Sequence, residues 1–309
     1  MSNIRAKVPG SIMLMGEHSV LFGEKALACA VDKYIHLSLI PCDQRTVTIK
    51  SALADYHSDL DSLTAHPDLS FVLAGISQFV DRLPSGFVLQ IESEFSHTVG
   101  LGSSAAVTAG TVAVLAAYAG LELDNDMLFD QSLRVVHQVQ DGRGSGTDLV
   151  ASIFGSIVSY SVAPRSIHAL SGLPDISLYY VGYKTTTPVV LKKIEQLRRS
   201  NKAVYDQIYA LMGQVTAEAE SAVLAQDWTK LGALMNNYQG LMDALGVSDL
   251  AISDLVYRLR ESENVLGAKI SGSGLGDCVL ALGADSSLDL PYEQIPVGVS
   301  EQGVSLEYF

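Results

Sequence analysis

The chain of 309 residues is short of cysteine, aromatic residues and positive charge, and each shortage excludes a class of protein. Its three cysteines are an odd number without CxxC or His-Cys spacing, which argues against a disulfide framework and a zinc site. Lysine and arginine total 20 against 34 acidic residues, and the formal net charge of -14 disfavours nucleic acid and anionic membranes as partners. A small anionic substrate stays compatible with this charge, because local positive groups can dominate a cleft.

Long hydrophobic runs are also missing. Residues 107–121 are apolar, but the stretch is rich in alanine and falls short of a bilayer span. Near the N-terminus, Glu17 and His18 follow too soon for a secretory signal peptide. We therefore expect a cytoplasmic protein with no membrane partner.

The hydrophobic content is high enough for a full core, and the chain is long enough for one large or two medium domains. Hydrophobic residues make up 48% of the chain and aromatic residues only 7%, so small apolar side chains must do much of the packing. Residues 164–174 have loop composition with a proline at each end. We place a domain boundary there, which gives domains over residues 1–170 and 171–309.

Apolar patterning predicts a mixture of strands and helices. Strands are expected within residues 4–50, at 87–91, 153–160 and 176–183, and on both sides of a glycine loop at 271–277. Helical spacing is found at 69–83, 104–120, 188–211, 213–225 and 228–245, and Asp124 or Asn125 and Asp249 can cap two further helices. The polar segment 51–66 is expected to be irregular and exposed. This order predicts an α+β architecture.

Residues 100–106, GLGSSAA, form a glycine-serine turn in front of a predicted helix. Gly100 and Gly102 allow a backbone conformation that a Cβ would hinder. Ser103 and Ser104 stand where the helix begins, and a helix N-terminus offers unpaired N–H groups and a positive dipole end to a phosphate. Taken alone, the same residues also fit a helix cap that binds no ligand.

Glu17 and His18 stand in GEHSV, within otherwise apolar sequence. Burying two polar side chains without partners is costly. The pair is therefore either solvated on a turn or part of a cleft, where it would hydrogen-bond a hydroxylated or carboxylated substrate.

Asp148 ends the glycine-serine turn at residues 141–148, ahead of a predicted strand. A carboxylate held there can face a cleft and orient or deprotonate an attacking hydroxyl, as phosphoryl transfer requires. Taken alone, Asp148 also fits an Asx-turn.

A third glycine-rich stretch, SGSGLGD, covers residues 271–277. Its glycines at 272, 274 and 276 permit close approach of the backbone to a phosphate or substrate. A tight hairpin between two strands explains them as well. The GxGxG spacing, followed by a strand, differs from a Rossmann fingerprint.

In this order the three motifs resemble the GHMP kinase superfamily, and their details resemble the mevalonate kinases within it. The resemblance runs from PGSIMLMGEHSVLFG (9–23) through GLGSSAA to GAKISGSGLGDC (267–278), and residues 233–248 are also similar. GEHSV is the part that favours the mevalonate kinases. The resemblance implies phosphorylation of the primary hydroxyl of mevalonate by ATP and Mg²⁺, giving 5-phosphomevalonate for isoprenoid precursor synthesis.

The resemblance also implies a fold and a set of site residues. The expected GHMP kinase fold has a ribosomal-protein-S5-like N-terminal half and a ferredoxin-like C-terminal half, with the active site in the groove between them. Asp148 would be the catalytic carboxylate, Glu17 and His18 would help form the mevalonate site, and Ser104 would bind the magnesium ion. The ATP-binding residues would be Gly100, Leu101, Gly102, Ser103, Ser104, Ala105, Gly272 and Gly274. A homodimer is compatible with this interpretation, and the sequence leaves the oligomeric state open.

Three features depart from the family pattern. Ser11 stands where the family usually has a lysine that approaches the reacting hydroxyl and phosphate. The candidates to replace it are Lys7, Arg143 and Lys184. His137 stands where a magnesium-binding glutamate is usual, and neutral imidazole is a poor partner for magnesium. Ser96 and Thr98 replace the proline and glycine that usually precede the loop at 100–106.

Two alternatives stay open at this point. Residues 137–156 and the Gly-Asp-Cys end of the third motif also look like bacterial phosphomevalonate kinases, although those enzymes need extra cationic residues and usually have tyrosine where His18 stands. The departures at Ser11 and His137 would also suit a non-catalytic GHMP-fold regulator. Retention of Ser104, Asp148 and the three glycine loops weighs against that third hypothesis.

Overall fold

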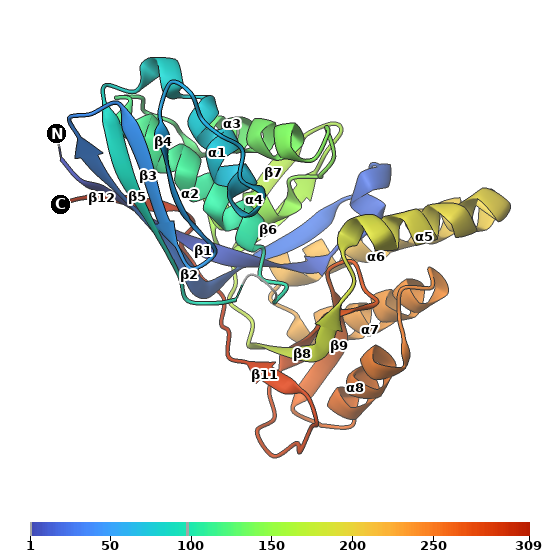
Figure 1. Cartoon of the computed structure of the whole chain (residues 1–309). Coiled ribbons are helices and arrows are strands. Elements are labelled where there is room, and N and C mark those ends of the chain that lie inside the picture. Colours follow the sequence, from blue (N-terminus) through green and yellow to red (C-terminus); the bar gives the residue numbers. More distant parts are fainter. Residues whose placement is uncertain (1, 97–98) are drawn as a thin grey trace.

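The computed structural model describes residues 2–96 and 99–309, so Thr98 lies outside the described residues. Figure 1 shows two lobes, each made of a β-sheet with helices packed against it, and the long strands β1 and β2 run from one lobe toward the other. These strands position the residues of the candidate site, because the loops at their ends reach both sheets.

The first sheet takes its strands mostly from the N-terminal part of the chain. Its order is β12-β1-β2-β5-β3-β4, and β6 pairs with both β2 and β7. The strands are β1 (Ile4–Met15), β2 (Ala26–Cys42), β3 (Thr46–Ser51), β4 (Asp55–Asp59), β5 (Gly86–Ser93), β6 (Ile157–Ser161), β7 (Ser166–Leu170) and β12 (Ser305–Tyr308). The helices packed with this sheet are α1 (Ser70–Ser77), α2 (Ser103–Tyr118), α3 (Asn125–Val139) and α4 (Thr147–Phe154). Short 3₁₀ helices cover Ser19–Phe22, Pro67–Leu69 and Val80–Arg82.

The second sheet is formed by the C-terminal part of the chain, in the order β11-β8-β10-β9. Its strands are β8 (Ile176–Lys184), β9 (Val265–Ser271), β10 (Gly276–Gly283) and β11 (Glu293–Ile295), and its helices are α5 (Thr187–Ser200), α6 (Lys202–Leu224), α7 (Trp228–Ala244) and α8 (Leu250–Arg260). Helices α7 and α8 pack on β9, and α6 packs on α7 and on the turn at Ser19–Phe22. The second lobe thereby holds the loop that carries Glu17 and His18.

The first part of strand β2, residues 26–31, is buried on both faces because it lies between two hydrophobic cores. Ala26 and Ala28 belong to the core of the first lobe, whereas Leu27 and Cys29 belong to the core that continues into the second lobe. Side chains alternate between the two faces of a strand, so a strand between two cores is apolar throughout. This explains the unbroken apolar run that leads into β2.

Two expectations of local structure are wrong. Residues 51–66 are not irregular throughout, because Asp55–Asp59 form β4, which pairs with β3 at the edge of the first sheet. An edge strand that faces solvent can be polar, so it leaves no apolar signal. The break between α5 and α6 falls at residues 200–202 rather than near 212, because the helical spacing continues across both positions.

The expected strand after Asp148 begins later than the pattern predicts. Residues Thr147–Phe154 form α4, and Asp148 lies in its first turn rather than in a turn before a strand. Gly146 and Gly155, with φ angles of 82° and 77°, bound this helix on either side. The glycines therefore start and end the helix instead of preventing it.

The boundary proposed at residues 170/171 falls between β7 and β8, the strands that lie in different sheets. Strand β12 then returns to the first sheet, where it pairs with β1. The division into domains stays a prediction. No helix within residues 2–96 and 99–309 has both the length and the apolar character that crossing a membrane requires.

Candidate active site

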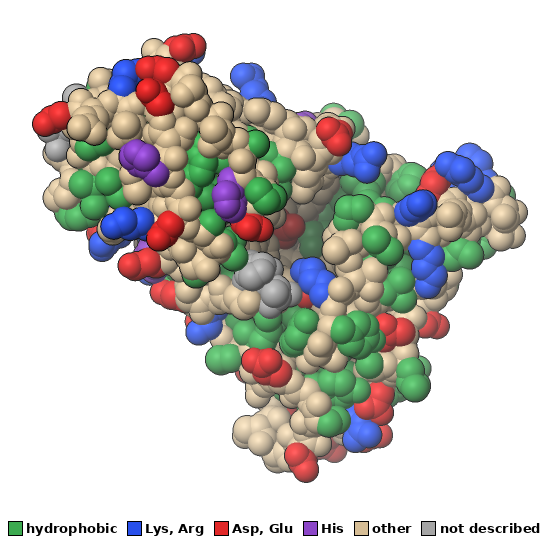
Figure 2. Space-filling model, in the orientation of Figure 1, with side chains coloured by type: hydrophobic (Ala, Val, Ile, Leu, Met, Phe, Trp, Pro, Cys, Tyr) green, Lys and Arg blue, Asp and Glu red, His purple; other side chains and the backbone are tan. Residues whose placement is uncertain are grey.

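A pocket of about 620 Å³ lies between the two lobes. The first lobe contributes the start of α2 and the start of α4, and the second contributes the end of β8 and the loop between β9 and β10. Figure 2 shows the hollow between the lobes, with acidic and basic side chains at its edge. The lining residues that carry the argument are Gly100, Gly102, Ser103, Ser104, Asp148, Lys184, Gly272, Ser273 and Asp277.

The glycine-serine loop packs so closely that its glycines cannot be replaced without movement. Gly102 has a φ of 63°, and a Cβ there would lie 1.9 Å from the Ser11 hydroxyl oxygen. A Cβ on Gly100 would lie 2.6 Å from a carboxylate oxygen of Asp277. Helix α2 begins at Ser103, so the N–H groups of Ser103 and Ser104 have no partner within the helix, whereas those of Ala105 and Ala106 donate to the Gly102 carbonyl oxygen. The loop offers these groups to the pocket, and Leu101 and Ala105 are buried behind it.

Asp148 faces the pocket with one specific hydrogen bond. The Ser11 hydroxyl donates to Asp148 Oδ1 at 2.9 Å. Burial raises the pKa of Asp148, the Ser11 hydrogen bond and the charge of Lys184 lower it, and the charge of Asp277 raises it again. The net shift is upward, which makes this carboxylate a better proton acceptor than an exposed aspartate.

Lys184 and Asp277 form an ion pair on the other side of the pocket. Lys184 Nζ lies 2.8 Å from Asp277 Oδ2, and the two side chains are 35% and 8% exposed. Lys184 pairs with Gly276 across β8 and β10, and a register shift before Cys278 places Asp277 next to the lysine. Asp277 Oδ1 is buried and has no hydrogen-bond partner among residues 2–96 and 99–309. The sequence pattern alone did not single out Asp277, although it follows the glycines of the third motif directly.

The other candidates for the missing lysine lie elsewhere. Lys7 Nζ lies 3.8 Å from the centre of the Tyr34 ring, and Arg143 is exposed in the loop before α4. Neither residue lines the pocket, whereas Lys184 does. His137, at the usual glutamate position, has its Nε2 3.1 Å from the Gly144 carbonyl oxygen and is also outside the lining.

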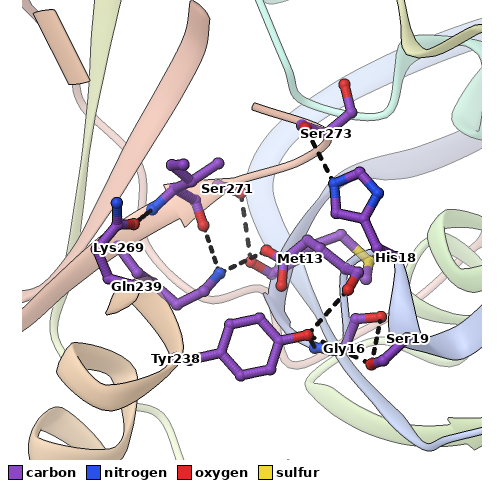
Figure 3. Close-up of polar contacts among 11 residues, drawn as sticks. Met13, Gly16, His18, Ser19, Tyr238, Gln239, Lys269, Ser271 and Ser273 are labelled. Atoms are coloured by element: carbon purple, nitrogen blue, oxygen red, sulfur yellow. Dashed lines mark hydrogen bonds and ion pairs between the residues drawn. The ribbon is translucent and has the colours of Figure 1, made fainter. Parts of the chain in front are cut away.

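Glu17 and His18 are buried rather than solvated, and neither is among the residues that line the pocket. Figure 3 shows His18 pointing toward Ser273, with Tyr238 beside Gly16 and Ser19. Lys269 Nζ lies 2.5 Å from Glu17 Oε1, and both side chains are almost fully buried. Tyr238 donates its hydroxyl to the Glu17 carbonyl oxygen at 2.9 Å and accepts from the Gly16 N–H at 3.1 Å. Of the two alternatives that the sequence left open, the solvated turn is therefore excluded.

His18 reaches the pocket indirectly. Its Nε2 donates to the carbonyl oxygen of Ser273, a lining residue, at 3.0 Å. Its Nδ1 is buried and has no partner within the described part of the chain. Burial lowers the pKa of His18 from 6.5 to about 4, so the imidazole is neutral at physiological pH. The role of Glu17 and His18 in substrate binding stays a prediction.

The glycine loop between β9 and β10 divides its glycines between two environments. Gly272 lines the pocket, with a φ of 98°. Gly274 instead packs on the loop before α8, where a Cβ would lie 2.4 Å from the Val247 carbonyl oxygen. Of these two predicted ATP-binding residues, only Gly272 is placed where a ligand in the pocket could touch it.

No cluster of three or more His, Cys, Asp or Glu side chains suited to a metal ion occurs in the described part of the chain. Ser103 and Ser104, whose side chains carry hydroxyl oxygens, nevertheless line the pocket at the start of α2. Magnesium usually keeps several waters and binds through one or two protein oxygens and substrate phosphates. The donor set therefore fits a magnesium ion that arrives with a nucleotide.

Comparison with known proteins agrees with this geometry. Residues 70–156 match the GHMP kinases N-terminal domain and residues 219–289 match the GHMP kinases C-terminal domain. The mevalonate kinase of Thermococcus sibiricus is 31% identical over 306 residues, covering 93% of this chain and 91% of its own length. That of Saccharolobus solfataricus is 27% identical, covering 90% of each chain.

Solved structures show the same fold. The Methanococcus jannaschii mevalonate kinase matches with a TM-score of 0.81 at 18% identity, covering 96% of this chain and 98% of that one. A Streptococcus pneumoniae phosphomevalonate kinase matches with a TM-score of 0.76 at 20% identity, covering 100% of both. These matches confirm the expected α+β, two-part fold. The chain therefore belongs to the GHMP kinase family.

Proposed function

We propose that this protein transfers the γ-phosphoryl group of ATP to the primary hydroxyl of mevalonate, giving 5-phosphomevalonate and ADP. One observation carries the proposal: the glycine-serine loop and a carboxylate with a raised pKa, Asp148, face the same pocket. Relatives that match this chain over most of its length are mevalonate kinases, which supports mevalonate as the acceptor.

The nucleotide phosphates would lie against the loop at residues 100–106. The N–H groups and the positive dipole end of α2 favour negative charge there. Ser104 would hold a magnesium ion together with water and the phosphates, and the ion would neutralise charge on the phosphate oxygens. Ser104 lines the pocket at the start of α2, beside the place that the phosphates would take.

Asp148 would act as the general base. The acceptor hydroxyl oxygen forms a bond to the γ-phosphorus, and the bond from the γ-phosphorus to the bridging oxygen breaks with its electron pair passing to ADP. The hydroxyl proton passes to the Asp148 carboxylate. Ser11 donates to Oδ1 of Asp148, so this hydrogen bond orients the carboxylate and leaves Oδ2 for the proton.

The acceptor would lie near Ser273, in front of the buried Glu17 and His18. His18 fixes the Ser273 carbonyl, and Lys269 with Tyr238 fixes the loop that carries Glu17. This arrangement supports a site with a rigid wall for a small hydroxy acid. A site built to hydrogen-bond such groups rejects analogues that lack them, because its own polar groups would lose their partners.

The proposal includes a cytoplasmic location and leaves room for a homodimer. All three cysteines are free, which suits a reducing compartment. Exposed apolar side chains on α5 and α6, namely Val189, Val204 and Leu211, could contribute to a subunit interface. Light scattering of the purified protein would measure its mass in solution and so test the dimer.

The test of function is ADP release from Mg-ATP over a panel of hydroxy acids and sugars. We expect release that depends on mevalonate and that greatly exceeds release with the other acceptors. Preferential turnover of a sugar would contradict mevalonate as the acceptor, whereas the assignment as a kinase would stand. An absence of ADP release with every acceptor, by protein that binds ATP, would support the non-catalytic alternative.

A phosphomevalonate kinase is the second candidate, because the Gly-Asp-Cys sequence at residues 276–278 resembles those enzymes. The lining of the pocket argues against it. Among the lining residues of the described chain, Lys184 is the only lysine or arginine. A phosphorylated acceptor beside ATP would place two phosphate groups near a single cationic side chain.

A further inference from the structure

Lys184 stands at the end of β8, between the two groups that a phosphoryl transfer must bring together. On one side it pairs with Asp277, and Gly100 of the glycine-serine loop approaches the same carboxylate. It also lines the same pocket as Asp148, and its charge acts on that carboxylate. A phosphoryl group that moves from the loop to a hydroxyl at Asp148 would therefore pass beside the Lys184 ammonium.

We propose that Lys184 is a catalytic residue that contacts the phosphoryl group during transfer, and that Asp277 is its positioning residue. This inference rests on the proposed kinase function; it chooses Lys184 among the three candidates for the missing lysine and gives a role to Asp277, the last residue of the third motif. Ser11 cannot supply the positive charge of the lysine that usually stands at its position, because its hydroxyl is neutral and already donates to Asp148.

The ion pair suits this role because Asp277 positions the lysine while the Lys184 ammonium stays accessible from the pocket. Lys184 is one-third exposed and lines the pocket, so its ammonium can also donate to a phosphate oxygen. Asp277 is almost fully buried, so its carboxylate has little room to move. A cation fixed where charge develops stabilises the transition state and needs little reorganisation during the reaction.

The other lysine near the site is not available for the same task. Lys269 has a fully buried side chain, pairs with Glu17 at 2.5 Å, and does not line the pocket. It lies 5.4 Å from the centre of the Tyr238 ring, which covers it. Lys184 is thus the lysine that a bound phosphate can reach.

The experiment compares Lys184→Met with Lys192→Met, a matched loss of one positive charge from the exposed surface of α5. We expect Lys184→Met to lower kcat by about 10²–10³, the range found when one preorganised donor to a developing charge is removed. ATP affinity, measured by titration, should change by only a few-fold. Lys192→Met should match the wild type, and Lys184→Arg should recover part of the rate.

A second readout separates a catalytic role from a structural one. Removing Lys184 removes the nearby positive charge that lowers the pKa of Asp148, while the Asp277 charge that raises it stays. The acid limb of the kcat/KM profile should therefore move to higher pH in Lys184→Met. Asp277→Asn keeps the lysine but loses the ion pair, so its loss of kcat should be smaller.

Three results would overturn the proposal. One is a folded Lys184→Met enzyme with kcat within about threefold of the wild type, a change of less than 1 kcal/mol in the barrier. Another is a loss confined to the KM of the acceptor, which would place Lys184 on the acceptor carboxylate. The third is an unmoved acid limb. If the wild type prefers another acceptor, the variants are compared on that acceptor, so failure of the mevalonate assignment is distinguished from failure of the role of Lys184.

Discussion

Two lysine–carboxylate pairs lie at the junction of the lobes, and they differ chiefly in exposure. Lys184 and Asp277 face the pocket, with the lysine side chain 35% exposed, whereas Lys269 and Glu17 are 0% and 2% exposed. The distances are similar, 2.8 Å and 2.5 Å. The two ion pairs therefore have different roles. Lys184 offers an ammonium group that a substrate can reach, whereas Lys269 and Glu17 connect β9 to the loop after β1.

The surroundings of the two pairs explain this division. Around Lys269, burial raises the pKa of Glu17 and lowers that of the lysine, against the attraction between them. Such a pair is costly to break, because the remaining charge is left buried without a partner. Around Lys184 the pocket admits water or ligand, so its partner can be exchanged or shared at low cost.

The largest effect is expected on kcat, from a substitution in the pocket that Lys184 and Asp277 line. Asp148→Asn should lower kcat by about 10²–10⁴, the usual contribution of a general base. ATP affinity and stability should stay close to those of the wild type, because the glycine-serine loop is untouched. The measurement is steady-state ADP formation together with ATP titration, with Asp141→Asn in the exposed loop as the matched control. A variant that keeps more than about a tenth of the wild-type turnover would remove Asp148 from the mechanism.

For the buried pair, Lys269 and Glu17, the expected effect is on the stability of the fold. Lys269→Met should lower the free energy of unfolding by about 3–5 kcal/mol, because it leaves the Glu17 carboxylate buried and unpaired. Lys184→Met leaves the nearly buried Asp277 carboxylate at the wall of the pocket, where water can hydrate it, so the expected loss is smaller, about 1–3 kcal/mol. Urea unfolding of the two variants measures the contrast.

The double variant Glu17→Leu with Lys269→Met is the control for this contrast. An apolar pair of similar volume should recover most of the lost stability, since a buried ion pair is often replaceable in this way. Equal losses in Lys269→Met and Lys184→Met would show that exposure does not distinguish the two pairs.

A smaller effect is expected from His18 as pH falls. Its pKa is lowered from 6.5 to about 4 in the folded protein, so the unfolded chain binds the proton more readily. The stability due to neutral His18 is complete above pH 6.5 and is lost progressively toward pH 4, by up to about 3 kcal/mol. Urea unfolding at several pH values should show a flatter decline for His18→Gln than for the wild type. The matched change at the exposed His57, His57→Gln, should leave the decline unchanged, and an equally flat decline there would contradict the assignment to His18.

The sequence predicts those parts of the site that are formed by residues of a single short segment. Residues 100–106 and 141–148 contain their own glycines and polar groups, so a phosphate loop and a candidate base can be predicted from them directly. The N-caps Asp124 and Asp249 are local in the same way, and both side chains accept a backbone N–H as expected.

The rest of the site depends on pairing between distant segments. Lys184 meets Asp277 only because β8 pairs with β10 in a particular register. Lys269 meets Glu17 because the two lobes close on each other, and this contact joins residues that are 252 positions apart. Neither pairing leaves a pattern within either segment, so neither could be predicted without the fold.

Among the described residues that line the pocket, Lys184 is the only lysine or arginine. We therefore expect an acceptor that carries no phosphate before the reaction. The most direct measurement is the rate of ADP formation from Mg-ATP with mevalonate and, separately, with 5-phosphomevalonate. We expect kcat/KM for mevalonate to be at least about tenfold higher, which corresponds to 1.4 kcal/mol of discrimination. Faster turnover of 5-phosphomevalonate would contradict the claim.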